Sequence, residues 1–367
     1  MSGLYIHIPF CGSKCAYCDF YSLPKHEKDF GRYLDALSEE LAVRRQEVPS
    51  PFSTIYIGGG TPSILGVHGL DKLFEMLRNE HPAEFTIEVN PEHIDAEFAR
   101  FLANSPVNRV SIGIQSFVDT ELRAISRRHT ARRAADAVQM LRDAGIANIS
   151  IDLIFGLPGQ TAESWEHTLS TASALRPEHI SAYSLMYEPG TRLTAMLKAG
   201  KLKEPPQELS DEMYHILTRH LKEQGYVHYE ISNYALPGYK SRHNSSYWDL
   251  TPYLGIGASA HSFDGNVRRY NPPDLRKYMN NPTYSSVTEP ADESSRINEY
   301  LLVRLRTAEG LSISDFRNRF GDDAAHEMLA CARGDLSRGT LHRDEDTLRI
   351  PEEHWLIADS VIVDLFV

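Results

Sequence analysis

The sequence predicts an α/β fold: an open, partial barrel of six parallel strands with alternating helices, followed by a smaller C-terminal domain. Three observations support this. Short apolar runs alternate with stretches of helical spacing over the first 207 residues, which is typical of a parallel sheet with right-handed crossovers. The predicted strands have one apolar and one polar face. The pattern then changes after a charged, proline-containing segment at 201–208.

The six predicted strands are short runs rich in apolar and β-branched residues. They lie at 4–8, 54–58, 85–89, 109–116, 149–156 and 179–185. Helices are predicted between them, where apolar residues recur at three- and four-residue spacing. Two such stripes are Phe30, Tyr33, Leu34, Leu37 and Leu41, and Leu70, Leu73, Phe74 and Leu77. The segment 134–145 is a further helix, and it ends in a glycine suited to a helix C-terminus.

The polar faces of the strands indicate what the barrel encloses. Side chains alternate across a strand, so Tyr5, Glu88, Gln115 and Asp152 share the polar face. A closed barrel would bury such groups at roughly 1–3 kcal/mol for each one left unpartnered, whereas an open barrel can hold a polar ligand against them. The alternative is a flat sheet with one wet face, which is less favoured because parallel sheets are usually covered on both sides.

The remaining chain predicts a second domain, so that the two domains cover 1–207 and 208–367. An amphipathic helix is expected first, then a strand, a turn-rich segment, and finally helices followed by short strands. These parts lie at 211–225, 228–235, 236–285 and from 297 onward. The pattern indicates a small helical or winged-helix-like domain.

Composition excludes several classes of protein. The net charge of −12 argues against general nucleic-acid binding, which depends on an excess of Lys and Arg. No 18-residue apolar run is present, so no transmembrane helix is expected. The start, MSGLYIHIPFC, lacks the basic residues and long apolar core of a secretory signal. A cytosolic location is therefore expected, where clustered cysteines indicate metal or redox chemistry.

Three of the four cysteines, Cys11, Cys15 and Cys18, follow the first predicted strand. The carboxyl ends of the strands carry the chemistry in β/α barrels. Structural zinc takes four ligands, so three cysteines with no fourth nearby favour a [4Fe–4S] cluster with one iron left open. An amino acid's amine and carboxylate could chelate that iron. A zinc site completed by His7 or Asp19, unrelated thiols and a disulfide are the alternatives.

The segment IPFCGSKCAYCDF (8–20) resembles the signature of the radical S-adenosylmethionine (SAM) superfamily. YIGGGTPS (56–63), SIGIQSF (111–117) and IDLIFGLPGQT (151–161) resemble a narrower group, oxygen-independent coproporphyrinogen III oxidase and the haem chaperones of the HemW type. The resemblance extends from residue 4 to about 263. It implies that the three cysteines hold the cluster. It also implies SAM contacts at Tyr5, Tyr17, Gly59, Gly60, Thr61, Glu88, Gln115, Arg127 and Asp152.

Each of these SAM contacts also has a purely structural interpretation. The glycines could form a tight turn, and Tyr5 could be an aromatic residue at the barrel edge. Arg127 could be a solvated helix residue beside Arg128. Asp152 could cap a strand or helix.

Two departures from the oxidase point to the chaperone branch. Phe20 stands where the oxidase has a fourth cysteine, and the first strand begins at residue 4 without the oxidase's N-terminal segment. RHNSSYWD (242–249) also resembles a haem-chaperone motif, which implies His243 and Tyr247 as candidate haem ligands and Trp248 as a stacking surface. Residue chemistry alone favours a hydrogen-bonded His243 and a core Trp248. His261 is a second candidate ligand.

The resemblance therefore implies a haem chaperone that binds a [4Fe–4S] cluster, SAM and haem. It would deliver haem to acceptor proteins such as respiratory enzymes, with peripheral membrane contact and a homodimer as further expectations. Coproporphyrinogen decarboxylation is not expected in this branch, where the cluster would serve dimer formation or haem transfer. The alternatives are a true radical enzyme that decarboxylates coproporphyrinogen and a structural zinc protein.

Overall fold

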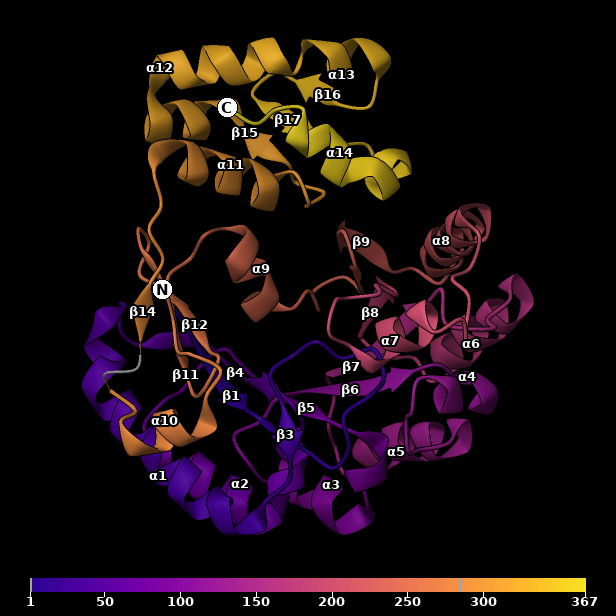
Figure 1. Ribbon diagram of the computed structural model, residues 1–367, viewed down its shortest axis with the longest axis vertical. Helices are drawn as coiled ribbons and strands as arrows, with labels where there is room; N and C mark the ends of the chain where they lie inside the picture. The colour runs from indigo at the N-terminus through magenta and orange to yellow at the C-terminus, as the bar shows by residue number, and fades with distance from the viewer. Residues whose placement is uncertain (1, 284–285) are drawn as a thin grey trace.

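The computed structural model describes residues 2–283 and 286–367, and its largest element there is a twelve-stranded sheet (Figure 1). The centre of the sheet confirms the predicted α/β class, because six parallel strands lie side by side in chain order. They are β1 (Ser2–Ile8), β4 (Phe52–Gly59), β5 (Glu84–Val89), β6 (Arg109–Gln115), β7 (Ile149–Phe155) and β8 (His179–Ser184). A two-stranded sheet of β2 (Phe10–Cys11) and β3 (Leu23–Pro24) follows β1.

Helices cover the outer side of this sheet, and the apolar strand faces are buried beneath them (Figure 1). The principal ones are α1 (Glu27–Arg44), α2 (Gly66–Met76), α3 (Ala96–Ala103), α5 (Ala131–Asp143), α6 (Ala162–Ala174) and α8 (Gln207–Glu223). Shorter helices are α4 (Asp119–Ala124), α7 (Arg192–Lys198), α9 (Arg242–Trp248) and α10 (Leu275–Asn280). Local sequence fixes several helix starts: at α6 the Thr161 and Ser164 side chains form a reciprocal capping box.

The segment predicted to be turn-rich, 236–285, contributes strands, and here the sequence expectation was incomplete. β11 (Tyr253–Ile256) pairs in parallel with β1, far from it in sequence, and adds a seventh parallel strand. Antiparallel strands then extend this edge: β12 (His261–Phe263), β13 (Arg268–Tyr270) and β14 (Val287–Thr288). At the other edge, the single strand expected at 228–235 is two antiparallel strands, β9 (Val227–Glu230) and β10 (Asn233–Ala235).

The last part of the chain forms helices around a small antiparallel sheet, as expected for a winged-helix-like unit (Figure 1). Its helices are α11 (Glu293–Arg304), α12 (Ile313–Cys331), α13 (Arg333–Arg338) and α14 (Ala358–Val363). Its strands are β15 (Leu311–Ser312), β16 (His342–Asp344) and β17 (Thr347–Arg349). The division of the chain at 207/208 stays a prediction; strands from both sides of that point share the large sheet.

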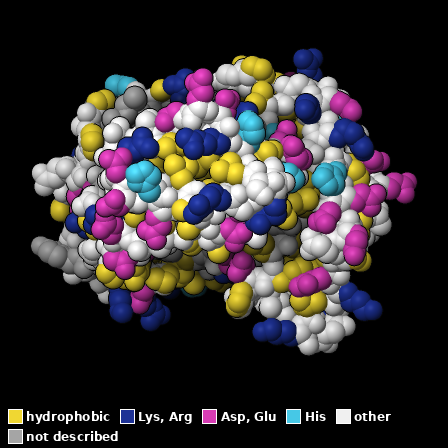
Figure 2. Space-filling view, turned by 90° about the horizontal axis from the view of Figure 1, so that it is seen from above, with side chains coloured by type: hydrophobic (Ala, Val, Ile, Leu, Met, Phe, Trp, Pro, Cys, Tyr) yellow, Lys and Arg dark blue, Asp and Glu magenta, His cyan; other side chains and the backbone are white. Residues whose placement is uncertain are grey.

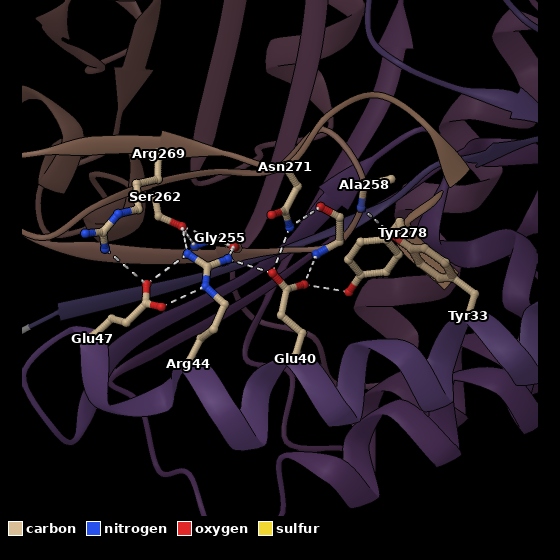
Figure 3. A network of polar contacts seen from close by, with 11 residues as sticks. Tyr33, Glu40, Arg44, Glu47, Gly255, Ala258, Ser262, Arg269, Asn271 and Tyr278 are labelled. Carbon is tan, nitrogen blue, oxygen red and sulfur yellow. Dashed lines mark hydrogen bonds and ion pairs between the residues drawn. The ribbon is translucent and has the colours of Figure 1, made fainter. Parts of the chain in front are cut away.

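A buried polar network fastens α1 to the late strands (Figure 3). We call Glu40 and Arg44, with their partners on 255–278, the α1 network. Arg44 Nη1 donates to Glu40 Oε1 at 2.6 Å and to the Gly255 carbonyl at 3.2 Å. Glu40 Oε2 accepts from Gly257 N and from the Tyr278 hydroxyl, at 2.9 and 2.6 Å. These bonds join the first helix to the segment that contains β11, and so hold the seventh parallel strand beside β1.

The surface seen from the side of the C-terminal unit carries acidic and basic side chains interspersed with hydrophobic ones (Figure 2). Among the described residues, none of the helices has the length and apolar character that a membrane span requires.

Candidate functional site

The polar face of the parallel strands encloses a cavity of about 640 Å³, which we call the lumen. Polar strand residues such as Glu88, Ser111 and Asp152 line its wall, and all three clustered cysteines lie at it. Trp355 and Asp359 of the C-terminal unit also line it. The polar strand faces therefore enclose a cavity instead of forming a flat wet surface.

Backbone hydrogen bonds hold the cysteine loop in place, and one of them joins Lys25 N to the Cys11 carbonyl at 2.9 Å. Cys11 is buried in β2, while Cys15 and Cys18 are partly exposed. Midway, Ala16 N donates to the Ile125 carbonyl at 3.0 Å. Burial raises the pKa of the Cys11 thiol and raises that of Cys18 to about 11. The thiols of Cys11 and Cys18 are therefore protonated at neutral pH until a metal binds them, since a coordinated thiol loses its proton.

Two glycines let the backbone approach this loop closely. A Cβ at Gly60 would lie 2.7 Å from the Phe10 carbonyl oxygen and 3.0 Å from Cys11 Sγ. Gly59 has φ = +112°, a conformation that favours glycine. Thr61 follows, with Oγ1 3.4 Å from Cys11 Sγ. The GGGTP segment thus runs from the end of β4 through a bend at Gly60 to the 3-10 helix Pro62–Leu65, and it lies against the first cysteine.

Arg127 links the cysteine loop to the strand ends. Its Nη1 donates to Cys15 Sγ at 3.4 Å and its Nη2 to Asn90 Oδ1 at 3.0 Å. The Gly113 carbonyl is a further acceptor. Although burial alone would lower its pKa, the nearby Tyr17 and Cys15 raise it overall. Arg127 is therefore a fixed cation beside the thiols rather than a solvated helix residue.

Two carboxyl groups project into the lumen from β5 and β7, the two strands that flank β6. Glu88 accepts from the Tyr56 hydroxyl at 2.7 Å and from Gly59 N at 3.0 Å. Asp152 accepts from the Ser111 hydroxyl at 3.3 Å. Burial raises the pKa of Glu88 to about 7 and raises that of Asp152 as well. Such shifts are common where carboxyl groups serve a ligand site.

The residues that line the lumen fit an iron–sulfur cluster and a polar ligand. Within the described ranges, no three His, Cys, Asp or Glu side chains are grouped closely enough to hold a single metal ion. A cluster requires a wider arrangement, because each thiolate binds a separate iron. Gln115 Oε1 is buried without a hydrogen-bond partner, and so are Arg109 Nε and Arg127 Nε. Buried polar atoms are normally partnered, so these three indicate ligand contacts.

The structure gathers nearly all of the predicted SAM-contact residues at the lumen. Those lining it are Tyr17, Gly59, Gly60, Thr61, Glu88, Gln115, Arg127 and Asp152. Tyr5 stands behind this wall, with its ring 6.1 Å from that of Tyr56 and its hydroxyl 3.0 Å from His7 Nδ1. Sequence reasoning missed Tyr56 and Arg109, which also line the lumen. Strand alternation could have found Arg109, because it shares the face of Gln115.

The predicted haem residues lie on α9, outside the lumen wall. His243 is 1% exposed, with Nδ1 2.9 Å from Thr54 Oγ1 and Nε2 2.8 Å from the Tyr247 hydroxyl. Burial lowers its pKa to about 3. Trp248 is partly exposed, and its indole nitrogen has no hydrogen-bond partner. His261 is half exposed on β12 and stacks on Tyr270.

The helix that carries His243 is anchored to the strands by a carboxylate. Glu84, buried at the start of β5, accepts from the backbone N–H groups of Arg242 and His243, at 2.8 and 2.9 Å. Negative charge is favourable at a helix N-terminus. Since both ring nitrogens of His243 also have partners, ligation of haem by this residue requires a rearrangement of α9.

Comparison with known proteins supports the radical SAM resemblance. The family model of the radical SAM superfamily matches residues 5–172. The structure resembles that of coproporphyrinogen III oxidase (HemN) from Escherichia coli, described as a radical SAM enzyme. The TM-score is 0.85, with 23% identity, and the match covers 100% of this chain and 90% of the other. The fold is therefore that of a radical SAM protein.

Curated relatives narrow the family. Heme chaperone HemW from Bacillus subtilis is 35% identical over 372 residues, 98% of this chain and 98% of the relative. HemW from Lactococcus lactis is 38% identical over 322 residues, covering 86% and 84% of the two chains. HemW from Escherichia coli K12 is 31% identical over 376 residues, covering 98% and 96%. The chain accordingly belongs to the HemW haem chaperone family of the radical SAM superfamily.

Proposed function

We propose that this protein is a haem chaperone that binds a [4Fe–4S] cluster through Cys11, Cys15 and Cys18, SAM within the lumen, and haem. Membership of the radical SAM superfamily implies the cluster and SAM. The relatives that this chain matches over nearly their whole length are named haem chaperones. When bound, the cluster supplies an iron open to the amine and carboxylate of SAM and a source of single electrons.

The observation that carries the proposal is the position of the cysteines beside a polar wall that includes buried atoms without a hydrogen-bond partner. The three thiols lie at one cavity with Glu88, Gln115 and Asp152. The amide and carboxylate groups can accept hydrogen bonds from ribose hydroxyls, and Arg127 holds a positive charge next to the thiols. Gly59 and Gly60 allow backbone N–H groups to approach a bound nucleotide.

Haem binding is supported by an apolar rim on the same cavity. Phe20, Tyr183 and Met186 line the lumen and are 65%, 42% and 65% exposed. Large apolar side chains exposed together commonly mark a ligand or partner site, and a tetrapyrrole is flat and apolar. Met and Tyr are also known haem iron ligands. Phe20 is the residue that replaces the oxidase's fourth cysteine, so this rim begins at the cysteine loop.

Several predictions from the sequence go further than these observations. They are His243, Tyr247 and Trp248 as haem contacts, respiratory enzymes as acceptors, a cytosolic location, peripheral membrane contact and a homodimer. The haem-ligand question can be tested directly. His243→Ala and His261→Ala are each titrated with haem and read by the Soret band. Loss of the wild-type spectrum in only one variant identifies the ligand. Wild-type spectra in both would exclude both residues.

The decisive experiment for the function uses anaerobically purified protein. Iron, acid-labile sulfide and zinc are measured, haem is titrated, and coproporphyrinogen is incubated with dithionite and SAM. We expect iron and sulfide, a saturable Soret change, haem transfer to an apo acceptor, and no decarboxylated product. Product formation without haem binding would identify a decarboxylase instead, and stoichiometric zinc without sulfide would refute the cluster.

A further inference from the structure

Arg109 is a cation on the inner wall of the barrel to which the proposed function assigns no ligand group. It is the first residue of β6 and shares its face with Ser111 and Gln115. It lines the lumen and is 1% exposed. Strand geometry puts its Cα about 20 Å from that of Gln115, which lies at the end of β6 nearer the cysteines. The Arg109 side chain therefore starts at the opposite end of the lumen.

The guanidinium of Arg109 has no partner in the part of the chain that the structure describes. Its Nε is buried without a hydrogen bond, and none of its nitrogens forms an ion pair or hydrogen bond with a described residue. Charged side chains are almost never fully buried unless paired. Arg306 provides the contrast: it also lines the lumen, yet it donates to Asp359 at 2.6 Å.

Two carboxyl groups, those of Glu88 and Asp152, feel the charge of Arg109, but neither accepts a hydrogen bond from it. Glu88 is hydrogen-bonded to Tyr56 and Gly59, and Asp152 to Ser111. Burial raises the pKa of both, and the charge of Arg109 only partly offsets that rise. Their influence on Arg109 is therefore through space, and the donor groups of its guanidinium remain available to a ligand.

We propose that Arg109 binds a carboxylate of a ligand held in the lumen. Arginine presents a planar set of donors that matches a carboxylate in two parallel hydrogen bonds. The inference deepens the proposed function and depends on it for the identity of the ligand. Two carboxylates are then available, a haem propionate and the carboxylate of SAM. The separation of Arg109 from the cysteine loop favours the propionate.

The test compares carboxylate and ester ligands. Wild type, Arg109→Gln and Arg109→Lys are titrated with haem and with haem dimethyl ester, read by the Soret band. SAM binding is measured by equilibrium dialysis on anaerobic, cluster-loaded protein. We expect Arg109→Gln to weaken haem binding about ten- to a hundredfold and Arg109→Lys to weaken it less. The ester should bind wild type as weakly as haem binds Arg109→Gln, with no further loss in the variant.

The outcomes distinguish a haem propionate from the carboxylate of SAM, and they distinguish failure of the Arg109 proposal from failure of the proposed function. Weakened SAM binding with unchanged haem binding supports the carboxylate role with SAM as the source. Unchanged affinity for both ligands overturns it. If wild type binds neither ligand, the proposed function itself fails. Arg142→Gln is the matched control, because that arginine lies on the outer helix α5 and is already paired with Glu178 at 2.6 Å. Should Arg109→Gln not fold, the ester comparison on wild type still decides.

Discussion

Two buried arginines of this protein have opposite surroundings. Arg44, in the α1 network, is 3% exposed and donates to Glu40, Glu47, Ser262 and the Gly255 carbonyl (Figure 3). Arg109, in the lumen, is 1% exposed and has no such partner among the described residues.

The difference separates structural charge from charge that serves a ligand. In the α1 network each donor of Arg44 meets an acceptor supplied by the chain itself, so the network holds helix and strands together without help. In the lumen no described side chain or carbonyl accepts hydrogen bonds from the buried Arg109 guanidinium, so a ligand must supply the missing acceptors. The same contrast distinguishes two buried acceptors. The Glu40 carboxylate accepts hydrogen bonds from several groups, whereas Gln115 Oε1 accepts none.

The largest effect expected is at the cysteine end of the lumen. Cys15→Ser removes one of three thiols, so we expect complete loss of cluster iron and of the brown colour, measured by iron and sulfide analysis. Cys331→Ser, at the exposed end of α12, is the control and should retain both. Because the α1 network stands on its own, the metal-free Cys15→Ser protein should unfold at the same urea concentration as metal-free wild type. A large shift would show that the two regions are not independent.

The next largest effect is in the α1 network. Arg44→Met leaves Glu40 buried without its cation, and we expect a loss of about 3–5 kcal/mol in the free energy of unfolding, measured with urea. The double variant Arg44→Met with Glu40→Gln removes both charges and should recover part of this loss. A single-variant loss below about 1 kcal/mol would contradict the structural role of this network.

Changing pH tests the lumen through Glu88. Its folded pKa is raised to about 7 from an ordinary 4.5, so the folded state retains a proton that the unfolded state loses. The contribution of Glu88 to stability therefore falls as pH rises from 4.5 to about 7, by at most about 3 kcal/mol. Unfolding of ligand-free wild type and Glu88→Gln across this range should show the variant gaining relative stability as pH rises. Parallel curves would refute the raised pKa.

A smaller effect is expected at Arg109 in the ligand-free protein. Arg109→Met removes an unpaired buried charge, so the free energy of unfolding should stay the same or rise by up to about 2 kcal/mol. This is the opposite sign to Arg44→Met at a similarly buried site, and it is measured by the same urea titration. A loss resembling that of Arg44→Met would mean that Arg109 has a structural partner.

The smallest change in stability is expected at an exposed ion pair, which serves as a reference for the buried charges. Lys72 and Asp35 form an exposed pair at 2.6 Å, with side chains 47% and 70% exposed. Asp35→Asn should change the free energy of unfolding by less than about 1 kcal/mol, because water screens the pair. A larger loss at this position would indicate that the charge effects in this protein do not follow burial.

Much of the site could be predicted from strand alternation. Because side chains alternate along a strand, Glu88, Gln115 and Asp152 could be assigned to one polar face before any pairing was known. The cysteine spacing likewise located the candidate cluster residues. Arg109 was overlooked although the same rule placed it on that face. That it has no partner could not be predicted, because partners come from other strands.

Local sequence patterns were sufficient to predict the six central strands, their polar faces and the cysteine loop, since these depend on residues close together in the chain. Three features came from the packing of distant segments: β11 pairs with β1 across some 250 positions of sequence, both ring nitrogens of His243 have hydrogen-bond partners, and Arg44 is paired whereas Arg109 is not. Contacts between distant segments depend on how the whole chain packs, and no local pattern records them.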